Sequence, residues 1–380
     1  MASRRASGEG SIFYREDRKR WVGVIDLGWI NGKRERRSVF GKTQKEVREK
    51  LSAMRREQER GVNLAVKSQT VEQYLTQWLS DVVQGSVRPR TYESYESTIR
   101  KHILPTLGRI ELTKLNPQHV QALLQCKKKE GLAPGSVANI RRVLRAALNQ
   151  ALEWEIVGRN AAKPVKPPKV ERLEIRVFTP DEANQFLLAI KGDRWEGLFA
   201  TALLTGLRQG ELLGLHWSDV HLDDGKLYVR YSLQRINRKL TLVAPKTEVS
   251  RREVRLARRA VDALRQHRVR QLEERLREGT RWQEQDLVFP STIGTPAEKS
   301  NINKKLSDLL EREGLPPMRF HDLRHCYASL LLSKGVHPKL VQDQLGHTQL
   351  STTMDLYSHV IPESRVEVAA AMDALLAVSE

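Results

Sequence analysis

The spacing of apolar residues changes along this chain, and that change constrains the fold more than any other feature. Between residues 11 and 40 the apolar residues alternate in short runs, which predicts three strands joined at hairpin signals at Glu16-Asp17 and Asn31-Gly32. A helix is then expected from Thr43, whose hydroxyl can cap it, to about Arg60. The first segment therefore predicts a small three-stranded sheet with one helix.

From residue 70 to about 159 the spacing becomes that of helices. Thr70 caps a first expected helix, a second follows Pro89, a third begins near Asn116-Pro117, and a fourth runs from about Ser136 to Glu155. In the fourth helix the inward positions are Ile140, Val143, Leu144, Ala147, Leu148 and Leu152, and the rim positions are Arg141, Arg142 and Arg145. We expect an all-helical domain of four or five helices with a basic face; the rival interpretation is that these arginines are ordinary solvated side chains.

Prolines and lysines interrupt every periodicity between residues 160 and 174, which is typical of an extended connector. The chain restarts with Thr179 as a helix cap, Pro180 at the first helical position and Glu182 three residues after the cap. The last part is expected to be mainly helical, with one three-stranded antiparallel sheet between residues 226 and 256. A helix is expected from 258 to 277, and its apolar stripe should pack into a core: Val261, Leu264, Val269, Leu272 and Leu276.

The predicted fold class is therefore multidomain α+β. Its boundaries are a sheet-plus-helix domain at 1–66, a helical domain at 67–165, a linker at 166–178 and a mainly helical domain with a small antiparallel sheet at 179–380.

The charge of the chain points to a polyanionic partner. Its 65 Lys and Arg residues against 46 Asp and Glu leave +19, with an isoelectric point near 10. Residues 1–66 alone hold 17 basic and 9 acidic residues, so that segment carries +8; the rival interpretation of it is a protein-docking module with a solvated basic surface. No apolar run is long enough to span a membrane and the N-terminus lacks a signal-peptide pattern, so we expect a cytoplasmic, nucleoid-associated protein.

Two cysteines, Cys126 and Cys326, lie in unrelated patterns. A disulfide framework or a cysteine-built zinc site is not indicated, and both are interpreted as buried thiols.

The chemistry-bearing residues lie in two similar motifs. In TGLRQGE, Arg208 and Glu211 are three residues apart and would share a helix face; in FHDLRH, His321 and Arg324 repeat that offset on a helix with an apolar face. Alone, the first pair would be an ordinary surface salt bridge. His321 and His325 could instead hold zinc, but the residues between them differ from those of a zinc protease helix, and His325 fits a structural role.

Together TGLRQGEL, HDLRHCYAS, LGH and YSH resemble, in this order, the tyrosine recombinase or phage integrase family. The resemblance implies that Arg208 and Arg324 clamp the scissile phosphate, that His347 donates a further hydrogen bond, and that Tyr357 is the nucleophile. It also implies that His321 helps to take the tyrosine proton, that Glu211 positions the arginine and histidine side chains, and that Lys246 protonates the leaving oxygen. Lys239, on the same expected hairpin, is the alternative to Lys246.

The chemistry of these residue types agrees with those roles. A tyrosine hydroxyl has a pKa of about 10, so attack at neutral pH needs a base and cationic neighbours. Arginine supplies a permanent planar charge where other enzymes use a metal, so no metal and no cofactor is expected. Without the upstream motifs, Tyr357 would be interpreted as an ordinary, partly buried tyrosine.

The resemblance also implies partners and domain roles. Residues 1–66 resemble an arm-type DNA-binding domain, with Arg15, Lys19, Arg20, Arg34 and Arg36 as candidate DNA contacts, and 67–165 resembles a core-site-binding domain that uses Arg141, Arg142 and Arg145. Double-stranded DNA with core and arm sites, a homotetramer on that DNA, an excisionase and a DNA-bending host factor are the partners that the family implies. The segment after Tyr357 is expected to form a helix that packs either on the next protomer or on its own domain.

The function that follows is site-specific integration or excision of a mobile element through a 3′-phosphotyrosyl intermediate. Three rival functions remain open from the sequence: a type IB topoisomerase, a chromosome-dimer resolvase or invertase, and a non-catalytic DNA-binding protein.

Overall fold

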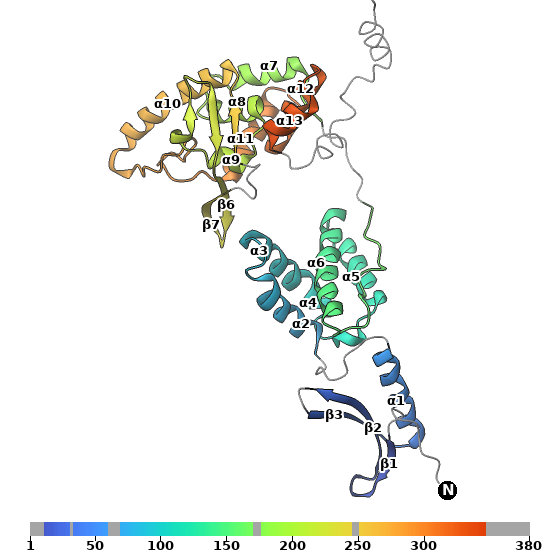
Figure 1. Cartoon of the computed structure of the whole chain (residues 1–380). Helices are drawn as coiled ribbons and strands as arrows, with labels where there is room; N and C mark the ends of the chain where they lie inside the picture. Colours follow the sequence, from blue (N-terminus) through green and yellow to red (C-terminus); the bar gives the residue numbers. More distant parts are fainter. Residues whose placement is uncertain (1–10, 31–32, 60–68, 170–175, 245–250, 347–380) are drawn as a thin grey trace, which may run out of the picture. The chain divides into compact units, whose positions relative to one another are not determined.

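The computed structural model describes residues 11–30, 33–59, 69–169, 176–244 and 251–346 (Figure 1). The chain divides into two units, residues 1–172 and 173–380. The predictions for Asn31-Gly32, Lys246, His347, Tyr357 and the terminal helix fall outside the described residues and stay predictions.

The N-terminal part of the first unit is the predicted sheet with one helix. Strands β1 (Ser11–Arg15), β2 (Arg20–Ile30) and β3 (Lys33–Gly41) pair antiparallel in that order, and α1 (Gln44–Glu59) follows. Thr43 caps α1 as expected, because its hydroxyl accepts from the Glu46 amide at 3.2 Å. Helix and sheet approach closely at Gly23, where an added Cβ would lie 2.6 Å from Val47 and 2.7 Å from Leu51.

The rest of the first unit is the predicted helical domain. Its longer helices are α2 (Val71–Trp78), α3 (Pro89–Thr98), α5 (Pro117–Lys129) and α6 (Pro134–Glu153). The shorter helical segments are η2 (Leu79–Val83), η3 (Ile99–Ile103), α4 (Leu104–Leu107) and η4 (Leu112–Lys114). Thr70 forms the expected cap, accepting from the Gln73 amide while the Gln73 side chain accepts from the Thr70 amide.

Two predictions about this helical domain are wrong. Leu152 is 40% exposed rather than inward, because it lies in the last turn of α6, beyond the buried stripe that ends at Ala151. Cys126 is exposed, not buried, and its Sγ lies 3.3 Å from the Glu130 carboxylate on the outer face of α5. Cys326 is buried, as expected.

The predicted connector begins later than residue 160. Ala161, Ala162 and Val165 are buried in the helical core, and the Asn160 side-chain amide donates to the Arg145 carbonyl at 2.9 Å. The segment from 160 to 165 has no helical or strand periodicity, yet it packs against the helices, because a chain without regular structure can still bury small side chains.

The second unit is mainly helical around one core. Its helices are α7 (Pro180–Ala189), α8 (Glu196–Thr205), α9 (Gln209–Leu213), α10 (Arg258–Glu278), α11 (Lys299–Arg312), α12 (Phe320–Ser333) and α13 (Pro338–Leu345). Its strands are β4 (Val220–His221), β5 (Lys226–Val229), β6 (Ser232–Ile236), β7 (Lys239–Val243) and β8 (Arg252–Arg255). The capping box predicted at Thr179 and Glu182 is present at the start of α7.

The strands of this unit do not form the single sheet that the sequence predicted. β4, β5 and β8 make a three-stranded sheet, whereas β6 and β7 make a separate two-stranded hairpin that projects from the unit (Figure 1). The expected first strand is interrupted at Arg230 and Tyr231, between β5 and β6, and the Arg230 guanidinium lies 3.1 Å from the buried Asp219 carboxylate.

The apolar stripe of α10 is only half buried. Val261 and Leu264 join the core as expected, but Val269, Leu272 and Leu276 are exposed, so that part of the prediction is wrong. The distal half of α10 extends away from the body of its unit, which explains the exposure (Figure 1).

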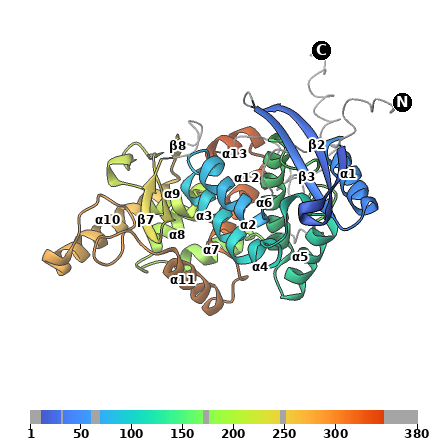
Figure 2. The same ribbon diagram turned by 90° about the horizontal axis from the view of Figure 1, so that it is seen from below.

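Helices α12 and α13 lie beside each other at the end of the unit opposite to α10 (Figures 1 and 2). Buried Ala328, Leu332, Val341 and Leu345 pack between these two helices. In the part of the chain that the structure describes, no helix is both long enough and apolar enough to cross a membrane.

Candidate active site

The site is built around the end of α8, a helix buried on nearly all sides. Gly206 ends α8 in the left-handed conformation, with a φ of 63°. A Cβ at this position would lie 2.6 Å from Tyr327 and 2.7 Å from Leu345, so glycine is required both by the backbone and by the space. The next residues of the chain, Leu207 and Arg208, then lead into α9.

Arg208 and Glu211 contact each other, though not as two residues on one helix face. Arg208 is the N-cap of α9 with an extended backbone, and Glu211 lies in the first turn. The Glu211 carboxylate accepts from the Arg208 backbone amide at 3.0 Å and from Arg208 Nη1 at 2.7 Å. The three-residue offset therefore works as a cap that also fixes the guanidinium, whose side chain stays 40% exposed.

Arg324 comes from α12 and is almost fully buried, at 2% exposed. Its Nη1 donates to the Gly206 carbonyl at 2.8 Å and its Nη2 donates to the Leu345 carbonyl at 2.7 Å. The guanidinium is thus held between the end of α8 and the end of α13, and its acceptor on α8, Gly206, lies two residues before Arg208 in the chain.

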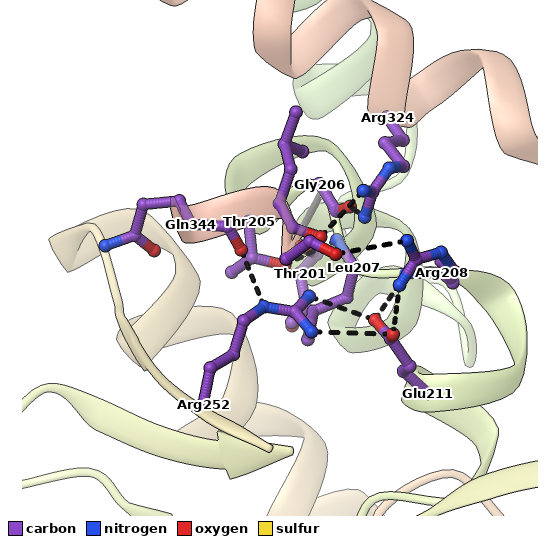
Figure 3. Close-up of polar contacts among 11 residues, drawn as sticks. Thr201, Thr205, Gly206, Leu207, Arg208, Glu211, Arg252, Arg324 and Gln344 are labelled. Carbon is purple, nitrogen blue, oxygen red and sulfur yellow. Dashed lines mark hydrogen bonds and ion pairs between the residues drawn. The ribbon is translucent and has the colours of Figure 1, made fainter. Parts of the chain in front are cut away.

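Three arginines from three different elements bind three consecutive carbonyls at the C-terminus of α13 (Figure 3). Arg252 Nε donates to the Gln344 carbonyl at 2.7 Å, Arg324 to that of Leu345, and Arg208 Nη2 to that of Gly346 at 3.5 Å. The carbonyls that end a helix have no partner within it and carry partial negative charge, so cations are favoured there.

His321 lies one turn before Arg324 on α12 and is exposed. Partial loss of hydration, and then the Arg324 and Arg208 cations, lower the pKa of His321 from its ordinary value. The imidazole is therefore neutral at physiological pH, which is the state that accepts a proton.

His325 is buried behind His321, with the two rings 5.1 Å apart and perpendicular. Burial, followed by repulsion from His321 when that ring is protonated, lowers the pKa of His325 to about 4. Among the residues described, no group of three or more His, Cys, Asp or Glu is arranged to hold a metal ion.

Arg252 is the residue that sequence reasoning missed. It begins β8 and its side chain is 7% exposed, against 6% for Glu211, whose carboxylate it contacts at 3.0 Å. Strand alternation did carry a signal: Arg252 and the fully buried Val254 are two residues apart and share a face, so this arginine had to find a buried partner.

The candidate DNA contacts of the N-terminal sheet share one face. In the antiparallel register, Arg15 of β1 stands opposite Arg20 of β2, and Asp26 of β2 stands opposite Arg36 of β3. Arg34 lies two residues before Arg36 on β3 and so shares its face. Partners across a sheet lie on the same face, and successive residues of a strand alternate between faces. Gly23 of β2 faces Val47 of α1, so Arg20 and Asp26, an odd number of residues away, lie on the opposite face, and the four arginines lie there with them. Lys19 lies outside the strands, in a left-handed turn between β1 and β2.

The candidates on α6 differ in their surroundings. Arg141 is partly buried and donates to the Lys163 carbonyl at 3.0 Å. Arg142 and Arg145 are both exposed, and Arg142 donates to the Asn139 side chain at 2.6 Å.

Comparison with known proteins gives the class of this fold and site. Residues 176–364 match the model of the phage integrase family, and residues 70–128 match that of the phage integrase N-terminal SAM-like domain. A tyrosine recombinase XerC-like protein of Caldanaerobacter subterraneus is 30% identical over 91% of this chain and 93% of its own. An integrase of Streptomyces ambofaciens is 30% identical over 94% of each chain.

Solved structures share the fold at lower identity. The Tn1549 transposon integrase in complex with a circular intermediate DNA has a TM-score of 0.68 and 20% identity, over 81% of this chain and 100% of that one. A lambda integrase tetramer bound to a Holliday junction has a TM-score of 0.58 and 18% identity, over 95% and 99% of the two chains. This chain belongs to the phage integrase family of tyrosine recombinases, enzymes that cut and rejoin DNA in site-specific recombination.

Proposed function

We propose that this recombinase is the integrase of a mobile element and that it cleaves DNA with Tyr357. The observation that carries the proposal is the convergence of Arg208 and Arg324 on the end of α13, immediately before His347 in the chain, with His321 one turn before Arg324 and within electrostatic range of both cations. Two fixed guanidinium groups next to a neutral imidazole form a site for a phosphodiester and for a group that gives up a proton.

In the proposed reaction, the Tyr357 oxygen attacks the phosphorus and the bond from phosphorus to the 5′ oxygen breaks. His321 helps to take the tyrosine proton, and Lys246 gives a proton to the leaving oxygen. Arg208, Arg324 and His347 stabilise the added negative charge on the phosphate, and Glu211 holds Arg208. The products are a 3′-phosphotyrosyl bond and a free 5′-hydroxyl, and attack by another 5′-hydroxyl reverses the step and joins a new strand.

The proposed DNA contacts follow the domains. Residues 1–66 bind arm sites through the sheet face that carries Arg15, Arg20, Arg34 and Arg36, with Lys19 beside it. Residues 67–165 and 179–380, joined by 166–178, hold the core site. Arg142 and Arg145 are the exposed candidates on α6, and Arg141, which is partly buried, donates to the Lys163 carbonyl.

The proposed assembly is a homotetramer on DNA, with an excisionase and a DNA-bending host factor as further partners. The lambda relative is a tetramer on a Holliday junction, which supports this assembly by similarity of fold. If residues 363–380 pack on the next protomer, deleting them should abolish recombination and leave DNA binding intact. If they pack on their own domain, the truncated protein should lose both activities or neither.

The experiment that tests the chemistry compares the wild type with Tyr357→Phe. Each is incubated in EDTA and without ATP with a nicked duplex, whose sequence is the region that the protein protects from nuclease cleavage. A covalent adduct formed only by the wild type is the expected result. Specific protection without any adduct would favour a DNA-binding protein, and an adduct in Tyr357→Phe would mean that another residue is the nucleophile.

A further inference from the structure

Arg252 holds together the parts of the site that lie farthest apart in the chain. Its guanidinium contacts both oxygens of Glu211, with Nη2 to Oε2 at 3.0 Å and Nη1 to Oε1 at 3.5 Å. Its Nε donates to the Gln344 carbonyl at 2.7 Å. A single side chain from β8 therefore fixes the first turn of α9 and the last turn of α13.

The packing leaves this guanidinium little freedom. Gly346 ends α13 with a φ of 65°, and a Cβ there would lie 2.9 Å from Arg252 Nη1 and 3.1 Å from Cζ. The helix end thus rests directly against the guanidinium. Only a residue without a side chain permits that approach, so the end of α13 and Arg252 fix each other's position.

The charges around Glu211 explain why this contact matters for Arg208. Burial alone would raise the pKa of Glu211, but Arg252 first and Arg208 second lower it below its ordinary value. Glu211 is thus a buried carboxylate shared by two guanidinium groups, one from its own turn and one from β8. Without Arg252 the carboxylate would have a single cation partner and could shift towards it, and Arg208 would move with it.

We propose that Arg252 is a positioning residue of the recombination site: it orients Arg208 through Glu211 and sets the end of α13 through Gln344. This proposal rests on the proposed function, because the phosphate that Arg208 binds is the scissile one. The Arg252 side chain is 7% exposed and its guanidinium is engaged by Glu211 and the Gln344 carbonyl, so it is not placed to bind the phosphate itself. Its effect should therefore fall on the rate of the chemical step and not on DNA affinity.

The test measures adduct formation by Arg252→Gln on the nicked duplex across a range of protein concentrations. We expect the plateau rate to fall roughly 100-fold, the cost typical of a misplaced catalytic group, while the half-saturating concentration stays that of the wild type. Arg255→Gln is the matched control, because it removes the same charge from the same strand where the side chain is 67% exposed. That control should keep the wild-type rate.

Two further variants separate positioning from general support of the fold. Arg252→Lys keeps the charge, so it should fold, but its single ammonium cannot reach Glu211 and Gln344 together, and we expect a rate about tenfold below the wild type. The double variant Arg252→Gln/Glu211→Gln should be no slower than the slower single variant, since both act through one contact; multiplied losses would contradict the proposal.

The outcomes for the two proposals differ. Wild-type adduct formation with an equally fast Arg252→Gln variant overturns the role of Arg252 alone. A loss in Arg252→Gln that lies wholly in the half-saturating concentration also overturns it, because that loss would place the residue in DNA binding. A wild type that forms no adduct overturns the proposed function, and the role of Arg252 with it.

Discussion

Arg324 shows how a cation is kept in the interior of this protein. Burying a charge is costly unless it is well hydrogen-bonded, and the carbonyls of Gly206 and Leu345 accept from both Nη atoms. Both acceptors end helices, where carbonyls carry partial negative charge. The plane of the guanidinium is therefore fixed by the backbone before any substrate binds, and this preorganisation is what charge stabilisation in a transition state requires.

Arg324→Lys should therefore slow adduct formation strongly. A lysine keeps the charge but offers no planar fork, so it cannot satisfy both carbonyls and face a phosphate, and we expect a loss of roughly 10²–10³-fold in rate. Arg319→Lys is the control, since that arginine begins the same helix with its side chain 78% exposed. A wild-type rate in Arg324→Lys would show that charge alone is sufficient here.

His267 makes the stability of the second unit depend on pH. Burial is the main cause that lowers its pKa to about 4, and its ring nitrogen lies 2.6 Å from the Val288 carbonyl. The His267 ring takes up a proton near pH 6.5 in the unfolded chain and only near pH 4 in the folded chain. The neutral ring therefore contributes fully to the free energy of unfolding above pH 6.5, and this contribution is lost as the pH falls from 6.5 towards 4. Over that whole pH range the free energy of unfolding falls by an amount on the order of 3 kcal/mol.

Urea unfolding at about pH 7 and about pH 5 measures this effect. His267→Gln should show a smaller drop in the urea midpoint between the two conditions than the wild type does. His325, whose pKa is also lowered to about 4, should account for a further part of the drop. Exposed His221 is the control, and His221→Gln should leave the drop unchanged; an equal drop in His267→Gln would refute the assignment.

At the scale of elements, local signals predicted local structure well. The caps at Thr43, Thr70 and Thr179 were predictable because cap chemistry needs only three or four residues of sequence. Strand pairing was not, because it joins segments that are far apart in the chain, as β5 pairs with β8 and not with β6. Periodicity predicted which face of α10 is apolar but not how far a core covers it.

In the candidate site, too, the residues in local motifs were predictable and the residue that acts through a long-range contact was not. Arg208, Glu211, His321 and Arg324 stand in short motifs, and the structure brings them together. Arg252 stands in no motif, and its role depends on a contact with Glu211, 41 residues earlier. The backbone carbonyls that accept from the three arginines could not be predicted from the sequence, because every residue has a backbone carbonyl and none is marked as an acceptor.

The contact between α1 and the N-terminal sheet depends on Gly23. A larger side chain would enter the space of Val47 and Leu51, so Gly23→Val should destabilise this packing by about 1–3 kcal/mol. Faster hydrogen exchange of the α1 amides would report it. Ser38→Val adds a similar side chain on the opposite face and should not change that exchange; unchanged exchange in Gly23→Val would mean that the helix shifts at no cost.

At the scale of the whole molecule, the parts have separate cores. The sheet domain packs around Ile25, Val47 and Leu51, and the helical domain packs around residues between 71 and 165. The core beneath the recombination site begins at Phe178. Among the residues that the structure describes, the buried members of the later cores all come from residue 71 onward.

A chain of residues 67–380 should therefore still form the covalent adduct on a core duplex. It loses +8 of the +19 charge, so its binding should depend less steeply on salt, and added arm-site DNA should no longer bind to it.

The full chain carrying Arg34→Gln and Arg36→Gln is the matched comparison, because it keeps the sheet domain and removes two charges from its open face. That variant should lose arm binding and keep the adduct. If the shortened chain forms no adduct while the double variant does, the first domain supports catalysis directly. The proposal that residues 1–66 serve only in arm-site binding would then be wrong.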